Sequence, residues 1–213
     1  MRLRKIKNAK EKLLEFPNLV IQNPEDYIDK WSEIFKNSNE IHLEIGMGKG
    51  KFITTNAMLN PDKNYIGLEI SDSMVLKAAR EISQKEIKNL KLINYDAANL
   101  REIFKQKSIS KIYLNFSDPW PKARHAKRRL TSDEFLIQYL DILTDDGIIE
   151  MKTDNRNLFE YSLMKLNEFK FKFEEVNLNL HDIENNEIIT TEYEEKFKML
   201  KNIIYYIKVK KWT

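Results

Sequence analysis

The chain has 213 residues, of which 42% are hydrophobic and 32% charged, with 36 Lys and Arg against 33 Asp and Glu and a formal net charge of +3. This balance predicts a globular domain with a solvated surface and argues against a largely disordered chain. Because the chain has no cysteine, disulfides, thiolate zinc sites and cysteine nucleophiles are excluded. The longest apolar run, residues 203–207, is far shorter than the roughly 20 residues that cross a bilayer, so we expect no membrane span and a cytoplasmic location.

The first twelve residues, MRLRKIKNAKEK, are strongly basic. No apolar stretch of the length found in a signal peptide follows them. The chain contains only five glycines and five prolines, without a low-complexity linker or an internal repeat. We therefore expect residues 1–213 to form a single domain with a basic N-terminal arm over about residues 1–38.

Short apolar runs alternate with segments of helical period from residue 41 onward. Helices are expected over residues 51–59 and 72–85, after Thr131 and after Asp154. Because strands that alternate with helices form crossover connections, this order predicts an α/β fold with a mostly parallel sheet and helices on both faces. The seven expected strands occupy residues 41–45, 64–70, 90–95, 111–116, 147–152, 171–176 and 203–210.

Capping signals mark the starts of two of these helices. Thr131 and Glu134 have the spacing of a capping box, and Asp154 stands where it can cap the following helix. About 26 mostly polar residues then separate the last two strands. A connection of that length in a compact domain is more often functional than a plain link.

A glycine-rich turn, LEIGMGKGKF, follows the first expected strand and opens the first long helix. The turn glycines at positions 46, 48 and 50 allow the backbone to approach a ligand at the carboxyl edge of the sheet. Glu69 ends the second strand, where an acid meets the two hydroxyls of a ribose. Dinucleotide sites prefer G-x-G-x-x-G. The shorter spacing here, preceded by Glu44, suits a cationic cofactor such as S-adenosylmethionine better than a pyrophosphate.

The third strand ends in NYDAANL, residues 94–100. Asp96 can accept a hydrogen bond from an adenine amino group, while Ala97 and Ala98 leave room for a flat ring. A second interpretation is that Asp96 only caps the next short helix. Acids at three successive strand ends favour a ligand site, because ligands bind at the carboxyl edge of a parallel sheet.

A rigid, basic stretch follows the fourth strand, with the sequence SDPWPKARHAKRR. Prolines fix the backbone on both sides of Trp120, which can stack on a base, and Asp118 can accept hydrogen bonds from ring N–H groups. Five cations between Lys122 and Arg129 can contact phosphates. A basic run is usually only a solvated face, but its position beside the expected cofactor site favours RNA.

The chain resembles the bacterial tRNA (guanine-N7)-methyltransferases in six segments that share the family's order and spacing: EIGMGKG, GLEIS, NYDAANL, FSDPWPKARHAKRRL, MKTDNRNLFEY and TEYEEKF. The resemblance runs from about residue 40 to the C-terminus, and the DPWPKxRHxKRR block is highly specific. It implies a Rossmann-like class I S-adenosylmethionine-dependent methyltransferase fold. It also implies methyl transfer to N7 of a guanosine at position 46, in the variable loop of tRNA.

The resemblance assigns roles to individual residues. The implied cofactor-binding residues are Glu44, Gly46, Gly48, Gly50, Glu69, Asp96 and Asp118, and Asp118 is also implied to be catalytic. The implied substrate-binding residues are Lys122, Asp154, Thr191, Glu192, Tyr193 and Glu194. The implied RNA-binding residues are Arg124, His125, Ala126, Lys127, Arg128 and Arg129.

The chain departs from the family pattern at two positions. Ser117 replaces the proline that usually precedes the acid, and Met47 stands where a smaller residue is common. Neither change removes a functional group. The expected partner is tRNA, with no membrane and no metal, because no group of histidines and acids has metal-ligand spacing. The expected state is a monomer or a homodimer.

Several alternatives stay open at this point. Without the resemblance, a helix cap is the better interpretation for Asp154, and a capping box is the better one for Thr191 with Glu194. Methylation of an exocyclic amine is a rival activity, since D-P-W-P is similar to the D-P-P-aromatic loop that holds such amines. A non-catalytic RNA-binding module is a rival of another class, and a nicotinamide oxidoreductase is disfavoured by the glycine spacing.

Overall fold

The structure is a computed structural model that describes residues 5–182, 189–200 and 202–212, with the backbone alone at 196–199. Its centre is one mixed sheet of eight strands in the order β1-β4-β3-β2-β5-β6-β8-β7. The strands are β1 (Val20–Ile21), β2 (Ile41–Ile45), β3 (Asn64–Glu69), β4 (Leu90–Asn94), β5 (Ile109–Asn115), β6 (Leu143–Thr153), β7 (Lys172–Asn177) and β8 (Tyr205–Lys210). β1 to β6 pair in parallel, whereas β8 runs antiparallel to both of its neighbours, β6 and β7. The predicted mostly parallel α/β fold is confirmed.

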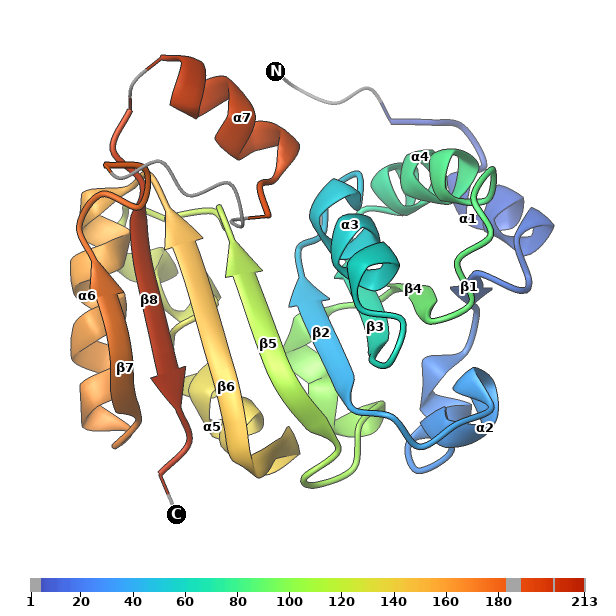
Figure 1. Cartoon of the computed structure of the whole chain (residues 1–213), viewed down its shortest axis with the longest axis horizontal. Coiled ribbons are helices and arrows are strands. Elements are labelled where there is room, and N and C mark those ends of the chain that lie inside the picture. The colour runs from blue at the N-terminus through green and yellow to red at the C-terminus, as the bar shows by residue number, and fades with distance from the viewer. Residues whose placement is uncertain (1–4, 183–188, 201, 213) are drawn as a thin grey trace.

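Helices lie on both faces of the sheet (Figure 1). One layer contains α1 (Ala9–Lys12), α3 (Lys51–Leu59) and α4 (Asp72–Ile82), and the other contains α2 (Trp31–Phe35), α5 (Asp133–Ile142) and α6 (Arg156–Glu168). Short 3₁₀ segments occupy η1 (Leu13–Glu15), η2 (Pro24–Tyr27), η3 (Ala97–Glu102) and η4 (Ala123–Arg128), and α7 (Glu192–Met199) lies above the strand ends. Alternate residues of β2 enter the two layers, because successive side chains of a strand point to opposite faces.

The eighth strand, β1, was not expected from the sequence. Val20 and Ile21 pair with Leu92 and Ile93 at the edge of β4, and two residues are too few to show a period of two. Leu13 and Trp31, which also precede residue 38, are buried in the core. This segment therefore carries a sheet edge and core side chains in addition to its basic residues.

The expected caps of α5 and α6, Thr131 and Asp154, each lie one residue before the observed N-cap residue. α5 begins at Asp133 after Ser132, while the Thr131 hydroxyl lies 2.7 Å from the Ser162 hydroxyl in the interior. α6 is capped by Asn155, whose Oδ1 accepts a hydrogen bond from the Leu158 amide at 2.9 Å. The side chain of Asn155 thus caps α6, whereas Ser132 at the start of α5 makes no side-chain capping bond, and both offsets are within the one or two residues by which helix boundaries differ.

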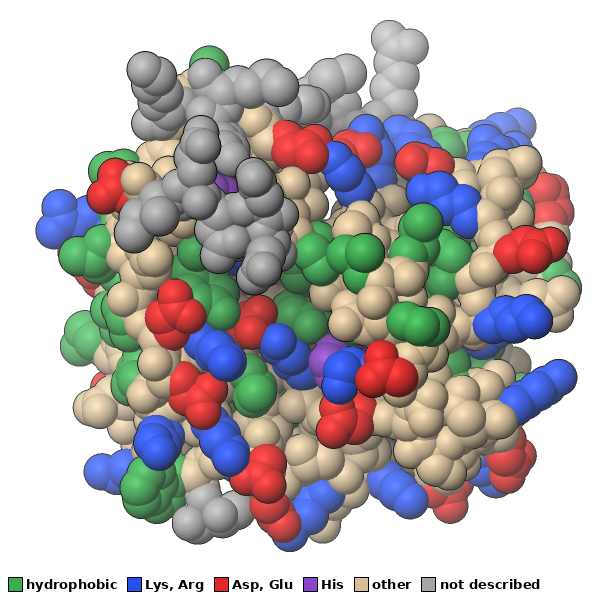
Figure 2. Space-filling view, viewed as in Figure 1, with side chains coloured by type: hydrophobic (Ala, Val, Ile, Leu, Met, Phe, Trp, Pro, Cys, Tyr) green, Lys and Arg blue, Asp and Glu red, His purple; other side chains and the backbone are tan. Residues whose placement is uncertain are grey.

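The face of β5, β6 and β8 on the α3 side carries no helix in Figure 1. Figure 2 shows acidic and basic side chains interspersed over this face. They include the pairs Lys111–Glu150 at 2.6 Å and Lys208–Glu174 at 3.2 Å. Among the described residues, no helix is long and apolar enough to cross a bilayer, and no cluster of three or more His, Asp or Glu side chains could hold a metal ion.

Candidate active site

A cavity of about 840 Å³ opens at the carboxyl ends of β2, β3, β4 and β5. Parallel strands end at the same edge, so residues that lie far apart in the sequence meet there. Its walls are Ile45, Gly46, Leu68, Glu69, Ile70, Asp96, Ala97, Ala98, Phe116, Ser117, Asp118, Trp120, Lys127, Arg128, Leu130, Glu134, Phe135 and Gln138. The structure thus brings together three of the acids singled out from the sequence, the tryptophan and two of the cations.

The three glycines of the turn have different positions relative to the cavity. All lie in the left-handed region, with φ of 78° at Gly46, 58° at Gly48 and 77° at Gly50, where a side chain is strained. Gly46 lines the cavity, and a Cβ there would meet open space. A Cβ at Gly50 would lie 3.1 Å from Ile82 Cδ1, so Gly50 permits close packing of α3 on α4. Gly46 is therefore the glycine of this turn that lines the cavity, whereas Gly50 is needed for the packing of α3 on α4.

Glu69 joins the glycine turn to the start of α4. Its two oxygens accept hydrogen bonds from the amides of Ser71 at 2.9 Å and Gly48 at 3.2 Å. Burial raises the pKa of the Glu69 carboxyl; these amide bonds lower it, and the nearby Asp118 charge adds to the rise. Repulsion between two carboxylates that share one cavity favours a cationic ligand between them.

Asp96 fits both interpretations that the sequence left open. Its Oδ1 accepts a hydrogen bond from the Ala98 amide at 2.9 Å and so caps η3. The same residue also lines the cavity together with Ala97 and Ala98. Gln138 of α5 fixes this corner from the other side, because its Oε1 accepts a hydrogen bond from the Leu100 amide at 2.8 Å. The cap thus holds an acid at the cavity wall.

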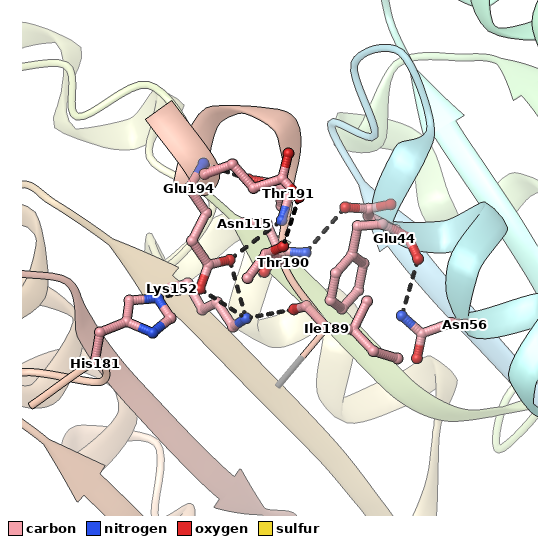
Figure 3. Close-up of polar contacts among 11 residues, drawn as sticks. Glu44, Asn56, Asn115, Lys152, His181, Ile189, Thr190, Thr191 and Glu194 are labelled. Atoms are coloured by element: carbon pink, nitrogen blue, oxygen red, sulfur yellow. Dashed lines mark hydrogen bonds and ion pairs between the residues drawn. The ribbon is translucent and has the colours of Figure 1, made fainter. Parts of the chain in front are cut away.

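Glu44 lies beside the cavity rather than in its wall. It is almost completely buried, Asn115 Nδ2 donates to its Oε1 at 2.9 Å, and its Oε2 has no partner among the described residues. Burial raises the pKa of Glu44 to about 8, against the opposing effects of Asn115, the nearby Ile53 backbone and Lys152. Figure 3 shows Glu44 on the opposite side of Asn115 from Lys152.

The loop after β5 presents Asp118 to the cavity in a strained backbone. Phe116 has φ of 51° and Trp120 has φ of 41°, values that are uncommon for aromatic residues. Asp118 itself is exposed and lies between them. Strain of this kind persists where surrounding contacts enforce it and is concentrated at functional sites.

The basic block divides into side chains with different surroundings. Lys127 and Arg128 line the cavity, and the Arg128 guanidinium lies 4.9 Å from the centre of the Trp120 ring. Arg124 Nε donates to His125 Nε2 at 3.3 Å on the surface. Arg129 is partly buried and bonds to the backbone of the loop. Lys122, which precedes η4, is exposed, and Ala126 lies within η4; neither lines the cavity.

The segment around Glu194 is held by an internal ion pair that the sequence did not reveal. Figure 3 shows Lys152 of β6 between Glu194 and the Ile189 carbonyl, with distances of 3.1 Å and 2.8 Å from its Nζ. His181 Nε2 lies 2.9 Å from Glu194 Oε1. Glu194 is fully buried. Its carboxylate is thus engaged by the protein itself.

The capping box of Thr191 and Glu194 is confirmed. The Glu194 amide donates to the Thr191 hydroxyl at 2.9 Å, and the Thr191 amide donates to Glu194 Oε2 at 3.2 Å. The strand run GIIEMK contains two charged residues, Glu150 and Lys152, and no periodicity identifies for Lys152 a partner 42 positions away.

Helix α7 is tied to the glycine turn by two further ion pairs. Lys49 lies 2.7 Å from Glu192, and Lys51 lies 2.5 Å from Glu195. These side chains are partly exposed, so each pair contributes on the order of 1 kcal/mol or less. Together with the buried pair, they hold the start of α7 over the strand ends.

Asp154 and Tyr193 lie next to one wall of the cavity. The Tyr193 hydroxyl donates to Asp154 Oδ2 at 3.3 Å, and the Tyr193 ring centre is 5.0 Å from that of Phe116, a cavity residue. Two segments 39 residues apart in the sequence thus meet beside the loop that carries Asp118. This meeting point was not predictable from either segment alone.

Comparison with known proteins agrees with this geometry. Solved structures with the same fold include a 16S rRNA (adenine(1408)-N(1))-methyltransferase from Catenulisporales acidiphilia with cosubstrate SAM, at a TM-score of 0.65 and 11% identity over 87% of this chain and 91% of that one. A 16S rRNA methyltransferase superposes with a TM-score of 0.66 and 14% identity over 87% of this chain and 94% of that one. The fold is that of the Rossmann-like class I methyltransferases.

A family model described as "Putative methyltransferase" matches residues 38–207. The tRNA (guanine-N(7)-)-methyltransferase of Geobacillus sp. is 47% identical over 99% of this chain and 96% of its own length. That of Bacillus subtilis is 46% identical over 98% of each chain, and that of Alkaliphilus oremlandii is 52% identical over 92% and 93%. The chain belongs to the tRNA (guanine-N7)-methyltransferase family.

Proposed function

We propose that this protein transfers a methyl group from S-adenosylmethionine to N7 of a guanosine in tRNA, at position 46 of the variable loop. Relatives named tRNA (guanine-N(7)-)-methyltransferase match this chain over nearly their full length. The observation that carries the proposal is the lining of one cavity, which has Glu69 and Asp96 on one side and Asp118, Trp120 and Arg128 on the other.

The acidic side of the cavity fits a cofactor that is cationic and contains adenosine. Glu69 lies at the end of β3, where a ribose is bound in this fold, and Asp96 stands beside two alanines that leave space for a flat ring. Glu44 lies buried beside this wall, and its Oε2 has no hydrogen-bond partner among the described residues, so a bound cation nearby would reduce the free-energy cost of ionising the carboxyl. When bound, S-adenosylmethionine supplies an electrophilic methyl group on a sulfonium.

The main task of the opposite wall, with Asp118, Trp120 and Arg128, is to align the guanine base. N7 of guanine is an sp² nitrogen with a free lone pair, so no proton must be removed before the methyl group is accepted. Orientation of the two reactants can lower the barrier by several kcal/mol. We assign Asp118 to the N1–H and N2–H edge of the base, where its carboxylate also offsets the positive charge that grows on the ring.

Further contacts to the nucleotide come from the segments beside the loop. Asp154 and Tyr193, which are hydrogen-bonded to each other, are proposed to bind the guanosine with Lys122, Thr191 and Glu192. Arg124, His125, Lys127 and Arg128 are proposed to contact the RNA, since cations outside a base pocket bind phosphates. Glu194 supports this segment from within, because Lys152 engages its carboxylate.

The test is incubation with methyl-labelled S-adenosylmethionine and unmodified tRNA, followed by nucleoside mapping. The expected product is N7-methylguanosine, which is positively charged and alkali-labile, at the variable-loop position. A tRNA with that guanosine replaced provides the control and should take up no label. A neutral N2- or N6-methylated product would instead support methylation of an exocyclic amine.

The role of Asp118 is tested by Asp118→Ala. The chemical rate should fall far more than the affinity for S-adenosylmethionine, because Asp118 is assigned to the base. Equal losses in both quantities would contradict that division and make Asp118 chiefly a cofactor ligand. Calorimetry of cofactor binding and single-turnover kinetics measure the two quantities separately.

A cytoplasmic site of action follows from the proposed tRNA substrate. A monomer or homodimer stays a prediction, and light scattering of the purified protein decides between the two.

A further inference from the structure

Arg129, the last cation of the basic block, differs from its neighbours in where its side chain is engaged. Its Nε donates to the Pro119 carbonyl at 3.1 Å, and its Nη2 donates to the Trp120 carbonyl at 3.1 Å. The planar fork of a guanidinium suits two successive acceptors, whereas an ammonium group acts as a point charge. Arg129 thus holds two consecutive peptide units of the loop that carries Asp118.

The other side of the guanidinium is fixed against α6. Its central carbon lies 4.3 Å from the centre of the Tyr161 ring, a cation–π distance. Two residues further on, the Thr131 hydroxyl lies 2.7 Å from the Ser162 hydroxyl in the interior. The chain from Arg129 to Thr131 is therefore docked on consecutive residues of α6, and this helix provides a rigid base for the loop.

The held loop needs such a support. Trp120, whose carbonyl accepts the second bond, has φ of 41°, and Phe116 has φ of 51°. Backbone in this region relaxes unless its surroundings fix it. Asp118 and Trp120 both line the cavity, and Asp118 lies between the two strained residues.

We propose that Arg129 is a positioning residue for methyl transfer: its guanidinium, stacked on Tyr161, fixes the carbonyls of Pro119 and Trp120 and so places Asp118 and Trp120 against the base. Arg129 is then no phosphate ligand, in contrast to the role that the resemblance gave it. The effect on methyl transfer rests on the proposed function. The effect on the loop does not.

The first test keeps the charge and removes the fork. Arg129→Lys should lower kcat for tRNA methylation about ten- to a hundredfold, with KM for tRNA and for S-adenosylmethionine changed less than about threefold, because a shifted loop misplaces a base that still binds. Arg80→Lys, an exposed arginine of α4, is the matched control and should leave kcat unchanged. Full activity of Arg129→Lys would overturn the proposal.

The second test observes the loop without any reaction. Protein labelled with 5-fluorotryptophan has three ¹⁹F resonances, since the chain has three tryptophans, and Trp120→Phe assigns the one from the loop. Arg129→Lys should shift or broaden the Trp120 resonance and leave those of Trp31 and Trp212 in place. Tyr161→Leu should do the same, whereas Tyr161→Phe, which keeps the ring, should not. An unmoved Trp120 resonance in Arg129→Lys would contradict the clamp.

The third test separates a clamp from a phosphate contact. Loss of one phosphate contact lowers the slope of log K for tRNA against log salt by about one. Arg129→Gln should leave this slope unchanged, whereas Lys127→Gln should lower it. A reduced slope for Arg129→Gln would make Arg129 an RNA ligand. If the wild-type protein methylated no tRNA, the proposed function would fail while the ¹⁹F spectra would still decide the role of Arg129 in the loop.

Discussion

Replacement of Glu44 by Gln removes a buried titratable group while it keeps the shape of the side chain. The Gln carbonyl can accept the hydrogen bond that Asn115 Nδ2 donates to Glu44 Oε1 at 2.9 Å. The other oxygen, Oε2, is buried without a partner among the described residues, so the amide of Gln and the hydroxyl of a protonated acid are in equivalent positions. The Gln variant therefore resembles the protonated wild-type protein.

The magnitude follows from the pKa of Glu44, which burial raises from 4.5 to about 8. The folded state holds a proton that the unfolded state releases above pH 4.5, so stability is fully present below that pH and is lost as the pH rises through about 8. At about 1.4 kcal/mol per pH unit, the loss over this interval amounts to roughly 5 kcal/mol. Glu44→Gln should not show this loss.

Urea unfolding followed by circular dichroism at pH 5, 7 and 8.5 measures the effect. The variant and the wild-type protein should agree within about 1 kcal/mol at pH 5, and the variant should be more stable by several kcal/mol at pH 8.5. Glu33→Gln, at an exposed position of α2, is the control and should leave the pH profile unchanged. Parallel profiles for Glu44→Gln and the wild-type protein would refute the reasoning.

Three other perturbations test separate parts of the structure. Burial, reinforced by nearby lysines, lowers the pKa of His42 to about 4. The free energy of unfolding should therefore fall as the pH falls from 6.5 through about 4. His42→Gln should shift the midpoint of acid unfolding to lower pH. Gly50→Ala should lower the free energy of unfolding by about 1–3 kcal/mol through strain and crowding. Gly46→Ala, whose added Cβ meets open space, should lower it less and should change the Kd of S-adenosylmethionine. Equal losses of stability in the two variants would contradict the packing argument. Glu194→Gln leaves Lys152 buried without its anionic partner, a change that costs up to about 3–5 kcal/mol of stability. Proteolysis within α7, measured by mass spectrometry, should therefore become faster. Unchanged cleavage would show that the ion pair does not hold the helix.

The sequence predicts those parts of the fold in which one local pattern decides the outcome. The glycine turn is an example, because three glycines within five residues predict a tight turn, and all three adopt left-handed backbone conformations. The strand β1 is the opposite case, since Val20 and Ile21 form a strand only because the edge of β4 is available to them. The formation of β1 therefore depends on a tertiary contact, which no local hydrophobic periodicity can indicate.

The site shows the same division between local and tertiary information. The topology of a parallel sheet brings strand ends together, and Glu69, Asp96 and Asp118 do line one cavity, whereas Glu44, which the sequence grouped with them, does not. The sequence could not reveal which cation of the basic block turns inward, since Arg128 and Arg129 are adjacent and chemically identical. Nor could it pair Lys152 with Glu194, because that contact depends on how α7 returns over the sheet.

The position of β8 between β6 and β7 has a consequence for how the chain matures. β7 precedes β8 in the chain but has no ladder to β6, so it cannot join the sheet until β8 has been synthesised and inserted. Because the chain is synthesised from its N-terminus, β1 to β6 can pair with one another before β8 is available to pair with β7. A truncation that removes β8 should therefore release β7 as well, and the nascent protein should become protease-resistant in its last quarter only late in translation.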